Sequence, residues 1–479
     1  MPMEAHPMSG IPEDIVVAEQ ASIEEVFHKL NANKKGIVFV VDDARRVIGC
    51  LTDGDIRRQL LVQNDLSVSI STFANRQFVH ASANAPREHI LKLLDNAIHV
   101  VPLLDAQGRL VKICSRDEFH LQDEGEMFAR ARAPARISFG GGGTDLTHFF
   151  FEQGGVVINA TIAKYAHATL RWRTDGRIHV YSHDLQARVE AGNMSELKLD
   201  GEMGLINSVI SLIKPRAGFD LEVSSDFPVG SGLGGSAAVT AAIIGCFNEF
   251  RTDPWTRHQI AEMAFQSERL IFKIAGGWQD QYATTFGGFN FMEFSADENV
   301  IVPLRLESRT LRELEACFLL CHTGKAHHSG AIHADQKNQM RASPGAASAA
   351  GRQKDITAEM HRLLLRGEVH RYGRLLHDAW QAKRQFSSLI SDSETDRIYD
   401  HAVANGAEGG KLLGAGGGGY FLFYVPPFSR YRLLNALKAI GYDCERLILD
   451  DGGLQSWKMR VPAAANSSTK AADADMLVI

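Results

Sequence analysis

Three short clusters of glycine constrain this chain more than any other feature of its sequence. They cover residues 140–143, 230–235 and 414–419, and they hold thirteen of the 43 glycines among 479 residues. Clustered glycines let backbone N–H groups approach an anion closely and adopt positive φ angles. A single cluster is explained equally well by a tight turn, so the function of these loops has to be inferred from their surroundings.

The second cluster matches the dinucleotide-binding pattern G-x-G-x-x-G, but its surroundings do not. That pattern requires a strand directly before it and an acidic residue at the end of a second strand. Here the strand predicted at 219–223 is followed by a loop at 224–228, and Glu249 ends a predicted helix at 236–250. The chain also has no G-x-x-x-x-G-K-[ST] motif. What remains is a glycine loop that leads into a helix N-terminus, which is a favourable seat for phosphate.

Ser236 stands at the start of that helix. Its hydroxyl can cap the helix, or it can bind a metal ion that bridges phosphates, and the two roles can coexist. Two carboxylates follow. On a helix predicted at 260–274, Glu268 falls between Ala264 and Phe272 while Leu270 joins the apolar stripe. Because burying a lone charge is costly, Glu268 is either a surface-edge residue or a cation ligand in a cleft.

Asp280 lies in the turn-rich segment 276–281, where it either caps a turn or serves as a base.

With these residues in place, the region from about 130 to 460 resembles GHMP-type small-molecule kinases. The three family motifs occur in order at 133–145, 228–238 and 410–419. The resemblance implies an α+β fold with two lobes: a ribosomal S5-like lobe at 131–320 and a ferredoxin-like lobe at 321–460.

Within this family, the chain is most similar to the branch that phosphorylates D-glycero-D-manno-heptose 7-phosphate. The supporting stretches are RISFGGGGTDL, GGWQDQYATTFGGFNF, HTGKAHHSG and GGKLLGAGGGGYF. They imply transfer of the ATP γ-phosphate to the anomeric hydroxyl, which gives the 1,7-bisphosphate. Gly142 replaces the acid that galactokinases carry, which argues against galactose, and Trp278 stands where a basic residue is expected. A fucokinase-like enzyme and a non-catalytic regulator on a kinase scaffold are the alternatives.

The resemblance also implies roles for individual residues. Asp280 would accept the proton of the sugar hydroxyl, and Arg136 would orient Asp280 and keep it ionised. Ser236 and Glu268 would hold Mg²⁺. The residues implied for the ATP phosphates are Gly230, Ser231, Gly232, Leu233, Gly234, Gly235, Ser236 and Ala237. The residues implied for the substrate are Gly142, Gly143, Thr144, Asp145, Gly416, Gly417, Lys383 and Arg384. A solvated helix face explains Lys383 and Arg384 equally well.

An internal repeat occupies residues 11–120, where 40–48 aligns with 103–111 at an offset of 63. Each copy predicts a helix, an apolar strand, a turn, a second strand and a second helix, with first helices at 23–30 and 89–94 and first strands at 37–41 and 99–104. We expect a linker at 121–130, a loop at 343–351 and a disordered tail at 461–479.

The repeat resembles a tandem of CBS domains, which implies an adenine nucleotide as ligand. The motif G-x-x-T-x-x-D occurs at 49–55, so Thr52 and Asp55 would hold the ribose. The second copy keeps Ser115 but has Lys112 and Glu118 in place of the glycine and aspartate. One nucleotide site is therefore expected. The alternative is that the pair of domains is purely structural or that it dimerises, which would give a homodimer.

Composition excludes several classes of protein. The net charge of −6 argues against a broad nucleic-acid surface. No apolar run approaches the ~18 residues of a membrane span, and the first residues do not resemble a signal peptide. Six scattered cysteines indicate reduced thiols in a cytoplasmic protein. His322, His327 and His328 match no zinc-binding pattern, so they are expected to contact substrate or lie at the surface.

Overall fold

The computed structural model describes residues 13–63, 65–94, 98–116, 126–325 and 329–461, and the chain divides into two compact units, 1–124 and 125–479. Glu118, His327, His328, the expected linker up to residue 125 and the expected tail after Val461 lie outside the described residues. No helix in the described part is long and apolar enough to span a membrane.

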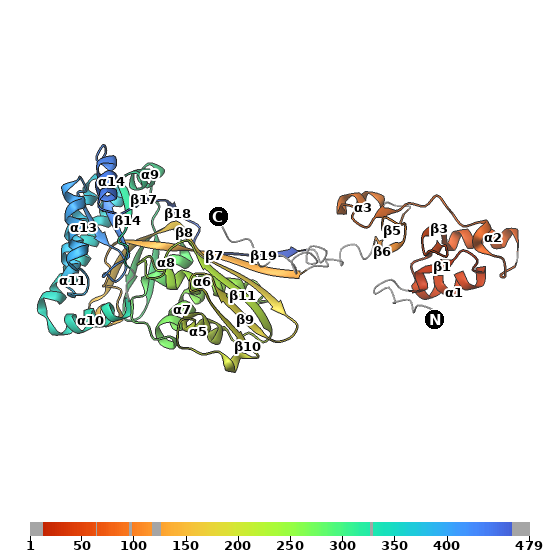
Figure 1. The fold of residues 1–479 in the computed structure, drawn as a ribbon, viewed down its shortest axis with the longest axis horizontal. Coiled ribbons are helices and arrows are strands. Elements are labelled where there is room, and N and C mark those ends of the chain that lie inside the picture. Colours follow the sequence, from red (N-terminus) through yellow and green to blue (C-terminus); the bar gives the residue numbers. More distant parts are fainter. Residues whose placement is uncertain (1–12, 64, 95–97, 117–125, 326–328, 462–479) are drawn as a thin grey trace. The chain divides into compact units, whose positions relative to one another are not determined.

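The N-terminal unit contains two copies of one small α/β motif (Figure 1). In each three-stranded sheet the first strand pairs in parallel with the second, and the second pairs antiparallel with the third. The first copy consists of β1 (Val16–Ala18), α1 (Ile23–Asn33), β2 (Ile37–Val41), β3 (Val47–Thr52) and α2 (Asp53–Val62). The second consists of β4 (Ala81–Ser82), α3 (Arg87–Leu93), β5 (Val100–Leu104) and β6 (Leu110–Ser115).

The repeat extends to details of the hairpins. A register shift falls between Val40 and Val41 in the first copy and at the equivalent point, 63 residues later, in the second. In the first hairpin Asp42 accepts hydrogen bonds from the backbone and the side chain of Arg46. The pair at positions 105 and 109 makes the same two bonds. The predicted repeat is therefore confirmed, and its predicted helices and strands are correct to within three residues.

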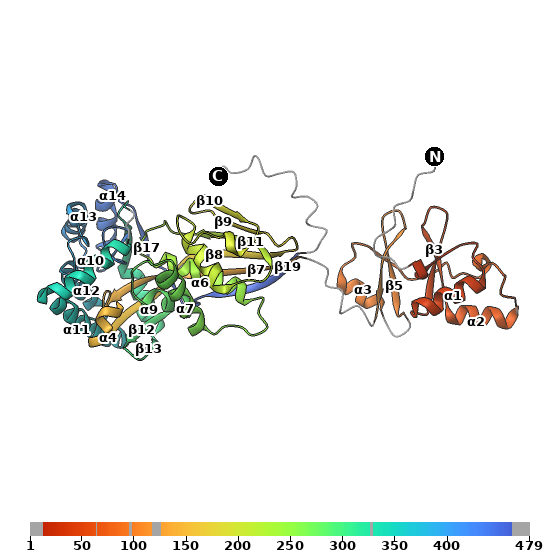
Figure 2. The ribbon, with the colours of Figure 1, turned by 90° about the horizontal axis from the view of Figure 1, so that it is seen from below.

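The larger unit is built on a long antiparallel ribbon of β7 (Glu126–Gly140) and β8 (Gly155–Arg173). The strand order is β10-β9-β11-β8-β12-β13, with β7 also on β8. The other strands are β9 (Ile178–Ser182), β10 (Ala187–Ala191), β11 (Gly218–Ser225), β12 (Phe289–Phe294) and β13 (Asn299–Pro303). Helices α5 (Gly204–Ile213), α6 (Gly235–Asn248), α7 (Arg257–Phe265) and α8 (Gln279–Phe286) accompany this sheet, and α6 packs against both ribbon strands (Figure 2).

A second, fully antiparallel sheet of four strands follows the order β15-β16-β14-β17. Its strands are β14 (Phe318–His322), β15 (Gly409–Leu412), β16 (Tyr420–Tyr424) and β17 (Cys444–Arg446). Helices α10 (Ser329–Ala342), α11 (Pro344–Arg366), α12 (Tyr372–Arg384), α13 (Ser393–Ala404) and α14 (Arg430–Ala439) gather at this end of the unit (Figure 2). This sheet has its own apolar core, centred on Trp380 and Phe421. Two mainly antiparallel sheets with their own helices confirm the predicted α+β class.

Three expected boundaries are wrong. Residues 126–130, expected in a linker, begin β7. Residues 344–351, expected in a loop, open α11, because alanine favours helix and Pro344 occupies its first turn. The last strands, β18 (Leu449–Asp450) and β19 (Gln455–Val461), return to β8 and β7 and so belong to the large sheet, not to the second lobe.

Candidate active site

The glycine loop 230–235 leads into α6 as predicted, but Ser236 does not cap the helix. The N-cap residue is Gly234, whose φ of 75° is left-handed and therefore favours glycine. A Cβ on Gly234 would also lie 3.1 Å from the Arg136 side chain. Ser236 lies inside the first turn, and its hydroxyl donates a hydrogen bond to Oε1 of Glu268. The capping alternative is therefore wrong, and the serine and the glutamate lie together.

Glu268 lies in a π-helical turn, Gln266–Ile271, that continues α7. A π-turn holds more residues than an α-turn, so side chains beyond it face other directions than on a continuous α-helix. Glu268 is 1% exposed while Leu270 is 62% exposed, so the predicted apolar position of Leu270 is wrong. Gln281 Nε2 donates to Glu268 Oε2 at 2.6 Å, and Arg269 Nη1 lies 3.1 Å from Oε1. The surface-edge interpretation of Glu268 is excluded.

Asp280 lies in the first turn of α8 rather than in a loop. The Arg136 guanidinium pairs with it through two bonds, Nε to Oδ1 at 2.7 Å and Nη2 to Oδ2 at 2.8 Å. Arg136 also donates from Nη1 to the Gly232 carbonyl at 2.6 Å. The predicted pairing is therefore present and ties β7, the glycine loop and α8 together. Each carboxylate oxygen of Asp280 keeps a lone pair beyond its bond to Arg136, and the side chain is 17% exposed.

The first glycine cluster brings Asp145 to the same place. Its carboxylate accepts from the Gly143 N–H at 3.1 Å and from both the backbone and the side chain of Gln279 at 3.3 and 3.1 Å. A Cβ on Gly277 would lie 1.9 Å from Asp145 Oδ2, so this close approach requires glycine. Burial, reinforced by the negative charge of Asp280, raises the pKa of Asp145.

The third glycine cluster packs directly on the second. A Cβ on Gly414 would lie 2.7 Å from Gly232 Cα, and one on Gly419 would lie 2.3 Å from the Ser231 carbonyl oxygen. The next residue, Tyr420, donates its N–H to that same oxygen at 3.1 Å. The two loops therefore meet backbone to backbone, which is a second reason for their glycines besides the binding of an anion.

Several residues predicted to bind substrate have protein partners. The Gly417 N–H donates to the Ile390 carbonyl at 2.8 Å, and a Cβ on Gly416 would meet Ile390 at 2.9 Å. The hydroxyl of Thr144 donates to backbone carbonyls within its own loop and on β8. These contacts shape the loops around Asp145.

The side chains of Lys383 and Arg384 lie in different surroundings, one buried and one partly exposed. Lys383 is 4% exposed and donates to the carbonyls of Leu412 and Gly414 at 3.0 and 2.6 Å. Arg384 pairs with Asp396 at 2.7 Å, and its side chain is 35% exposed. The solvated-face alternative is therefore wrong for Lys383.

Sequence reasoning missed four residues of this region. Gln279 and Gln281, on either side of Asp280, hold the carboxylates of Asp145 and Glu268. Lys411 on β15 is 3% exposed, and burial together with the Arg136 guanidinium lowers its pKa to about 7. His333 contacts Gln336 at 3.1 Å, and burial followed by the charge of Arg269 lowers its pKa to about 4. The alternating Gln-Asp-Gln of 279–281 and the lysine inside the third motif were the available signals.

The donor set at Ser236 and Glu268 fits a magnesium ion that also binds ATP. Mg²⁺ prefers oxygen ligands, and it takes only one or two from protein when phosphate oxygens and water supply the rest. The described residues hold no group of three or more His, Cys, Asp or Glu that could bind a metal alone. His322 Nδ1 accepts a hydrogen bond from the Gly324 N–H at 3.2 Å.

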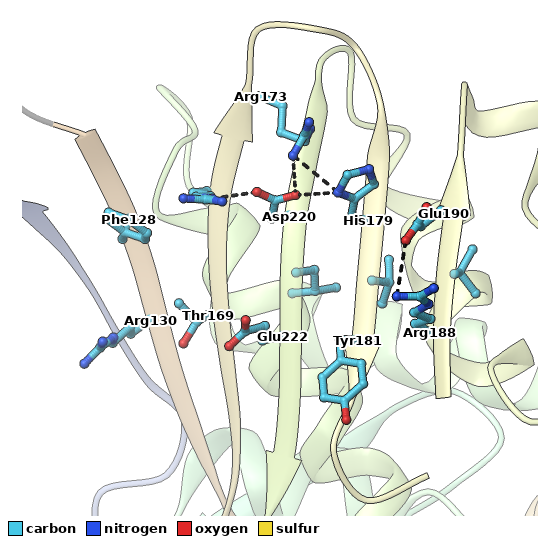
Figure 3. Close-up of a pocket in the computed structure, with 14 residues that line it drawn as sticks. Phe128, Arg130, Thr169, Arg173, His179, Tyr181, Arg188, Glu190, Asp220 and Glu222 are labelled. Carbon is cyan, nitrogen blue, oxygen red and sulfur yellow. Dashed lines mark hydrogen bonds and ion pairs between the residues drawn. The ribbon is translucent and has the colours of Figure 1, made fainter. Parts of the chain in front are cut away.

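A separate hollow of about 570 Å³ lies on the sheet face formed by β7, β8, β9, β10 and β11 (Figure 3). Arg171 and Arg173 line it, and both pair with Asp220, at 2.6 and 2.9 Å. Arg188 lies 3.7 Å from Glu190. These charges are compensated locally, and none of the predicted catalytic residues is present.

In the N-terminal unit, Thr52 and Asp55 form a capping box at the start of α2. Thr52 accepts from the Asp55 N–H, and Asp55 Oδ2 accepts from the backbone and the hydroxyl of Thr52 at 2.9 and 2.6 Å. Arg58 also contacts the Asp55 carboxylate. The two motif residues are therefore adjacent and held in place by the helix start.

Comparison with known proteins agrees with this architecture. The model of the GHMP kinases N terminal domain matches residues 204–288, and that of the CBS domain matches 10–62. The chain is 36% identical, over 69% of its length and 99% of the relative, to a D-glycero-alpha-D-manno-heptose 7-phosphate kinase of Campylobacter jejuni. It is 26% identical to an L-fucokinase/L-fucose-1-P guanylyltransferase of Bacteroides fragilis, over 60% of this chain but 34% of that protein.

Among solved structures, a D-glycero-D-manno-heptose 1-phosphate kinase of Bacteroides thetaiotaomicron superposes with a TM-score of 0.59 at 29% identity, covering 69% of this chain and 99% of that one. Fold and site thus define an ATP-dependent phosphotransferase that acts on a sugar hydroxyl. The chain belongs to the GHMP kinase family, and it carries a CBS domain ahead of the kinase unit.

Proposed function

We propose that this kinase transfers the γ-phosphate of ATP to the anomeric hydroxyl of D-glycero-D-manno-heptose 7-phosphate and so produces the 1,7-bisphosphate. The observation that carries this proposal is the Asp280 carboxylate, held by Arg136 next to the Ser236–Glu268 pair and to Asp145. The name of the Campylobacter jejuni relative supports the choice of sugar.

In the proposed reaction, the anomeric oxygen attacks the γ-phosphorus while the bond from that phosphorus to the β–γ bridging oxygen breaks. ADP leaves, and Asp280 takes the proton of the hydroxyl through an oxygen lone pair that Arg136 does not use. General-base help of this kind is typically worth about 10²–10⁴-fold in rate. The buried Asp145 would orient the sugar hydroxyls against the base.

The phosphates of ATP would lie over the loop 230–235 and the N-terminus of α6, where backbone N–H groups and the helix dipole favour negative charge. Ser236 and Glu268 would hold Mg²⁺, which neutralises charge on the transferring phosphate when it is bound. Gln281 and Arg269 hold the Glu268 carboxylate in place for that role.

Phosphorus NMR of the protein with Mg-ATP and heptose 7-phosphate tests the proposal through the appearance of a sugar 1-phosphate signal. Formation of ADP from ATP in the presence of L-fucose, but not in the presence of the heptose, would favour the fucokinase alternative. If no sugar phosphate and no ADP form with any of a panel of free and phosphorylated sugars, the non-catalytic regulator is the alternative that remains.

Asp280→Asn tests the catalytic base. We expect it to keep ATP binding and to lose at least about 100-fold in kcat, because the amide cannot accept the proton. Asp378→Asn, the same change at an exposed position on α12, is the matched control. An Asp280→Asn enzyme with kcat within threefold of the control would exclude Asp280 as the base.

For the N-terminal unit we propose an adenine nucleotide as ligand, with Thr52 and Asp55 against its ribose, and a homodimer formed through the repeat. The resemblance to tandem CBS domains supports both statements, and a cytoplasmic location agrees with the use of ATP. Equilibrium dialysis with AMP, ADP and ATP tests the first: Thr52→Ala is expected to lose AMP binding and to keep only the ATP and ADP that bind at the kinase site. Light scattering of the full chain and of a chain lacking residues 1–124 tests the second.

A further inference from the structure

Lys411 on β15 is a buried lysine with almost no partner among the described residues. The residue is 3% exposed, and among the described residues the one hydrogen bond of its side-chain nitrogen goes to the Phe139 carbonyl at 3.4 Å. No carboxylate of the described chain forms an ion pair with it. An ammonium carries three donors, and burying a charge without a counter-charge is costly. Such a group is expected to meet an anion during function.

The carboxylates near Lys411 have other partners. Both oxygens of Asp280 bond to Arg136, and the Asp145 carboxylate accepts three N–H groups from Gly143 and Gln279. Lys383 adds a second buried amine, which donates to two backbone carbonyls and, among the described residues, to no carboxylate. Burial and the Lys411 ammonium lower the pKa of Lys383 well below its ordinary value. Two lysine amines with lowered pKa values therefore lie close together, and an anion bound beside them would favour their protonated forms.

Gly142 lies next to the Lys411 amine and places no side chain against it. A Cβ at this position would lie 3.9 Å from Lys411 Nζ and 3.7 Å from Ser138 Oγ, which are ordinary contact distances. Unlike Gly141 and Gly143, Gly142 does not have a positive φ, so its backbone tolerates a side chain. An acidic residue here would be an internal partner for the ammonium, and this chain has none.

Trp278, which stands where a basic residue is expected, does not supply a second cation. Its ring stacks on Phe265 with centroids 3.5 Å apart, and its indole N–H donates to the Thr147 hydroxyl at 3.1 Å. The indole therefore offers an incoming anion no free donor. Recognition of a phosphate on the sugar has to come from another part of the site.

We propose that Lys411, with the open position at Gly142 before it, forms the subsite for the phosphate group of the sugar substrate. This inference rests on the proposed function and names the residues that select a phosphorylated sugar over a free one. An ammonium supplies charge-assisted hydrogen bonds to phosphate oxygens, and the absence of a side chain at position 142 admits the phosphate. Lys383 is a positioning residue, because its two bonds hold the end of β15 and the start of the third glycine loop.

The test compares kcat/KM for D-glycero-D-manno-heptose 7-phosphate with kcat/KM for the unphosphorylated heptose. Lys411→Met is expected to lower the ratio of the two by about 10- to 100-fold, since a hydrogen bond to a charged group is lost. Lys438→Met, at an exposed lysine of α14, is the control and should keep the ratio of the wild type. An unchanged ratio in Lys411→Met overturns the subsite, whereas a wild-type enzyme that phosphorylates neither sugar overturns the proposed function.

A second pair of variants leaves Lys411 in place. Gly142→Asp adds a carboxylate within reach of the ammonium, and Gly142→Ala adds the Cβ without the charge. We expect Gly142→Asp to lower the ratio at least tenfold relative to Gly142→Ala, because the internal carboxylate replaces the phosphate as partner. Titration calorimetry of heptose 7-phosphate without ATP should show the same order of affinities. Equal ratios and equal affinities in the two variants would overturn the subsite even if Lys411→Met does not fold.

Discussion

Because the second and third glycine loops are in contact, Gly419 is a position where an added side chain should disturb the site. Gly419 has a φ of 88°, and a Cβ added to it would lie 2.3 Å from the Ser231 carbonyl oxygen and 2.6 Å from its carbon. Because the obstacle is backbone, no rotation of a side chain relieves the clash. Gly419→Ala should therefore push the third loop away from the phosphate loop by about 1 Å, the difference from a normal contact.

The cost has two parts. A left-handed conformation costs a residue with a side chain about 1–2 kcal/mol. Displacement of the loop also strains two backbone bonds of Gly419, the one its carbonyl accepts from Thr323 at 2.8 Å and the one its N–H donates to Lys325 at 2.9 Å. Each is worth about 0.5–1.5 kcal/mol. We expect the free energy of unfolding to fall by about 2–5 kcal/mol.

Urea unfolding followed by fluorescence measures this change, and a coupled assay for ADP release gives kcat/KM for ATP. We expect kcat/KM for ATP to fall by about 100-fold, as a displacement of ~1 Å can cause. Gly351→Ala is the control: no atom lies within 4 Å of the added Cβ, and alanine should stabilise α11 by about 1 kcal/mol. Surface substitutions usually change the free energy of unfolding by no more than about 0.5 kcal/mol. If the free energy of unfolding of Gly419→Ala lies within that range of the wild type and kcat/KM for ATP is unchanged, the reasoning from the contact between the loops is refuted.

Three further predictions concern the groups around the reacting atoms. Arg136→Lys replaces the two-pronged contact with Asp280 by a point charge, so kcat should fall at least about tenfold while the far-UV circular dichroism is kept; an unchanged kcat would contradict the orienting role. Ser236→Ala should raise the Mg²⁺ concentration for half-maximal rate with little change in the melting temperature, and an equal Mg²⁺ dependence would remove Ser236 as a ligand. Burial lowers the pKa of His333 from 6.5 to about 4, so between these pH values the unfolded chain binds one proton more than the folded chain. The free energy of unfolding therefore falls as the pH drops from 6.5 to 4, by up to about 1.4 kcal/mol per pH unit. His333→Gln should flatten the urea midpoint across that window, and an equally steep profile would show that another group is responsible.

The parts of the site that could be predicted are those encoded by residues close together in the chain. The glycine loop before α6 and the helix N-terminus after it follow from one short stretch, and the repeat follows from two copies of one pattern. The pairing of Arg136 with Asp280 joins distant positions, and it could be predicted because a family resemblance linked their motifs.

The parts that could not be predicted depend on contacts between distant segments. Lys383 carries an ordinary helix pattern, and its burial follows from the carbonyls of Leu412 and Gly414 that pack beside α12. A continuous α-helix would place Leu270 on the apolar side, whereas the π-turn carries it to the surface. The return of β19 to β7 leaves no local signal, since a short polar strand can pair with many edges.

That returning strand has a consequence for the newly made protein. The pairing of Val461 with Glu126 spans more than 300 residues, so a ribosome must release almost the entire kinase region before β7 gains its second neighbour. Until then β7 has one open edge, and an unpaired strand edge is a template for strands of other chains. Synthesis that stops before residue 455 should therefore give aggregates rather than a smaller active enzyme. The last seven residues of the described chain thus protect the first strand of the kinase from intermolecular pairing.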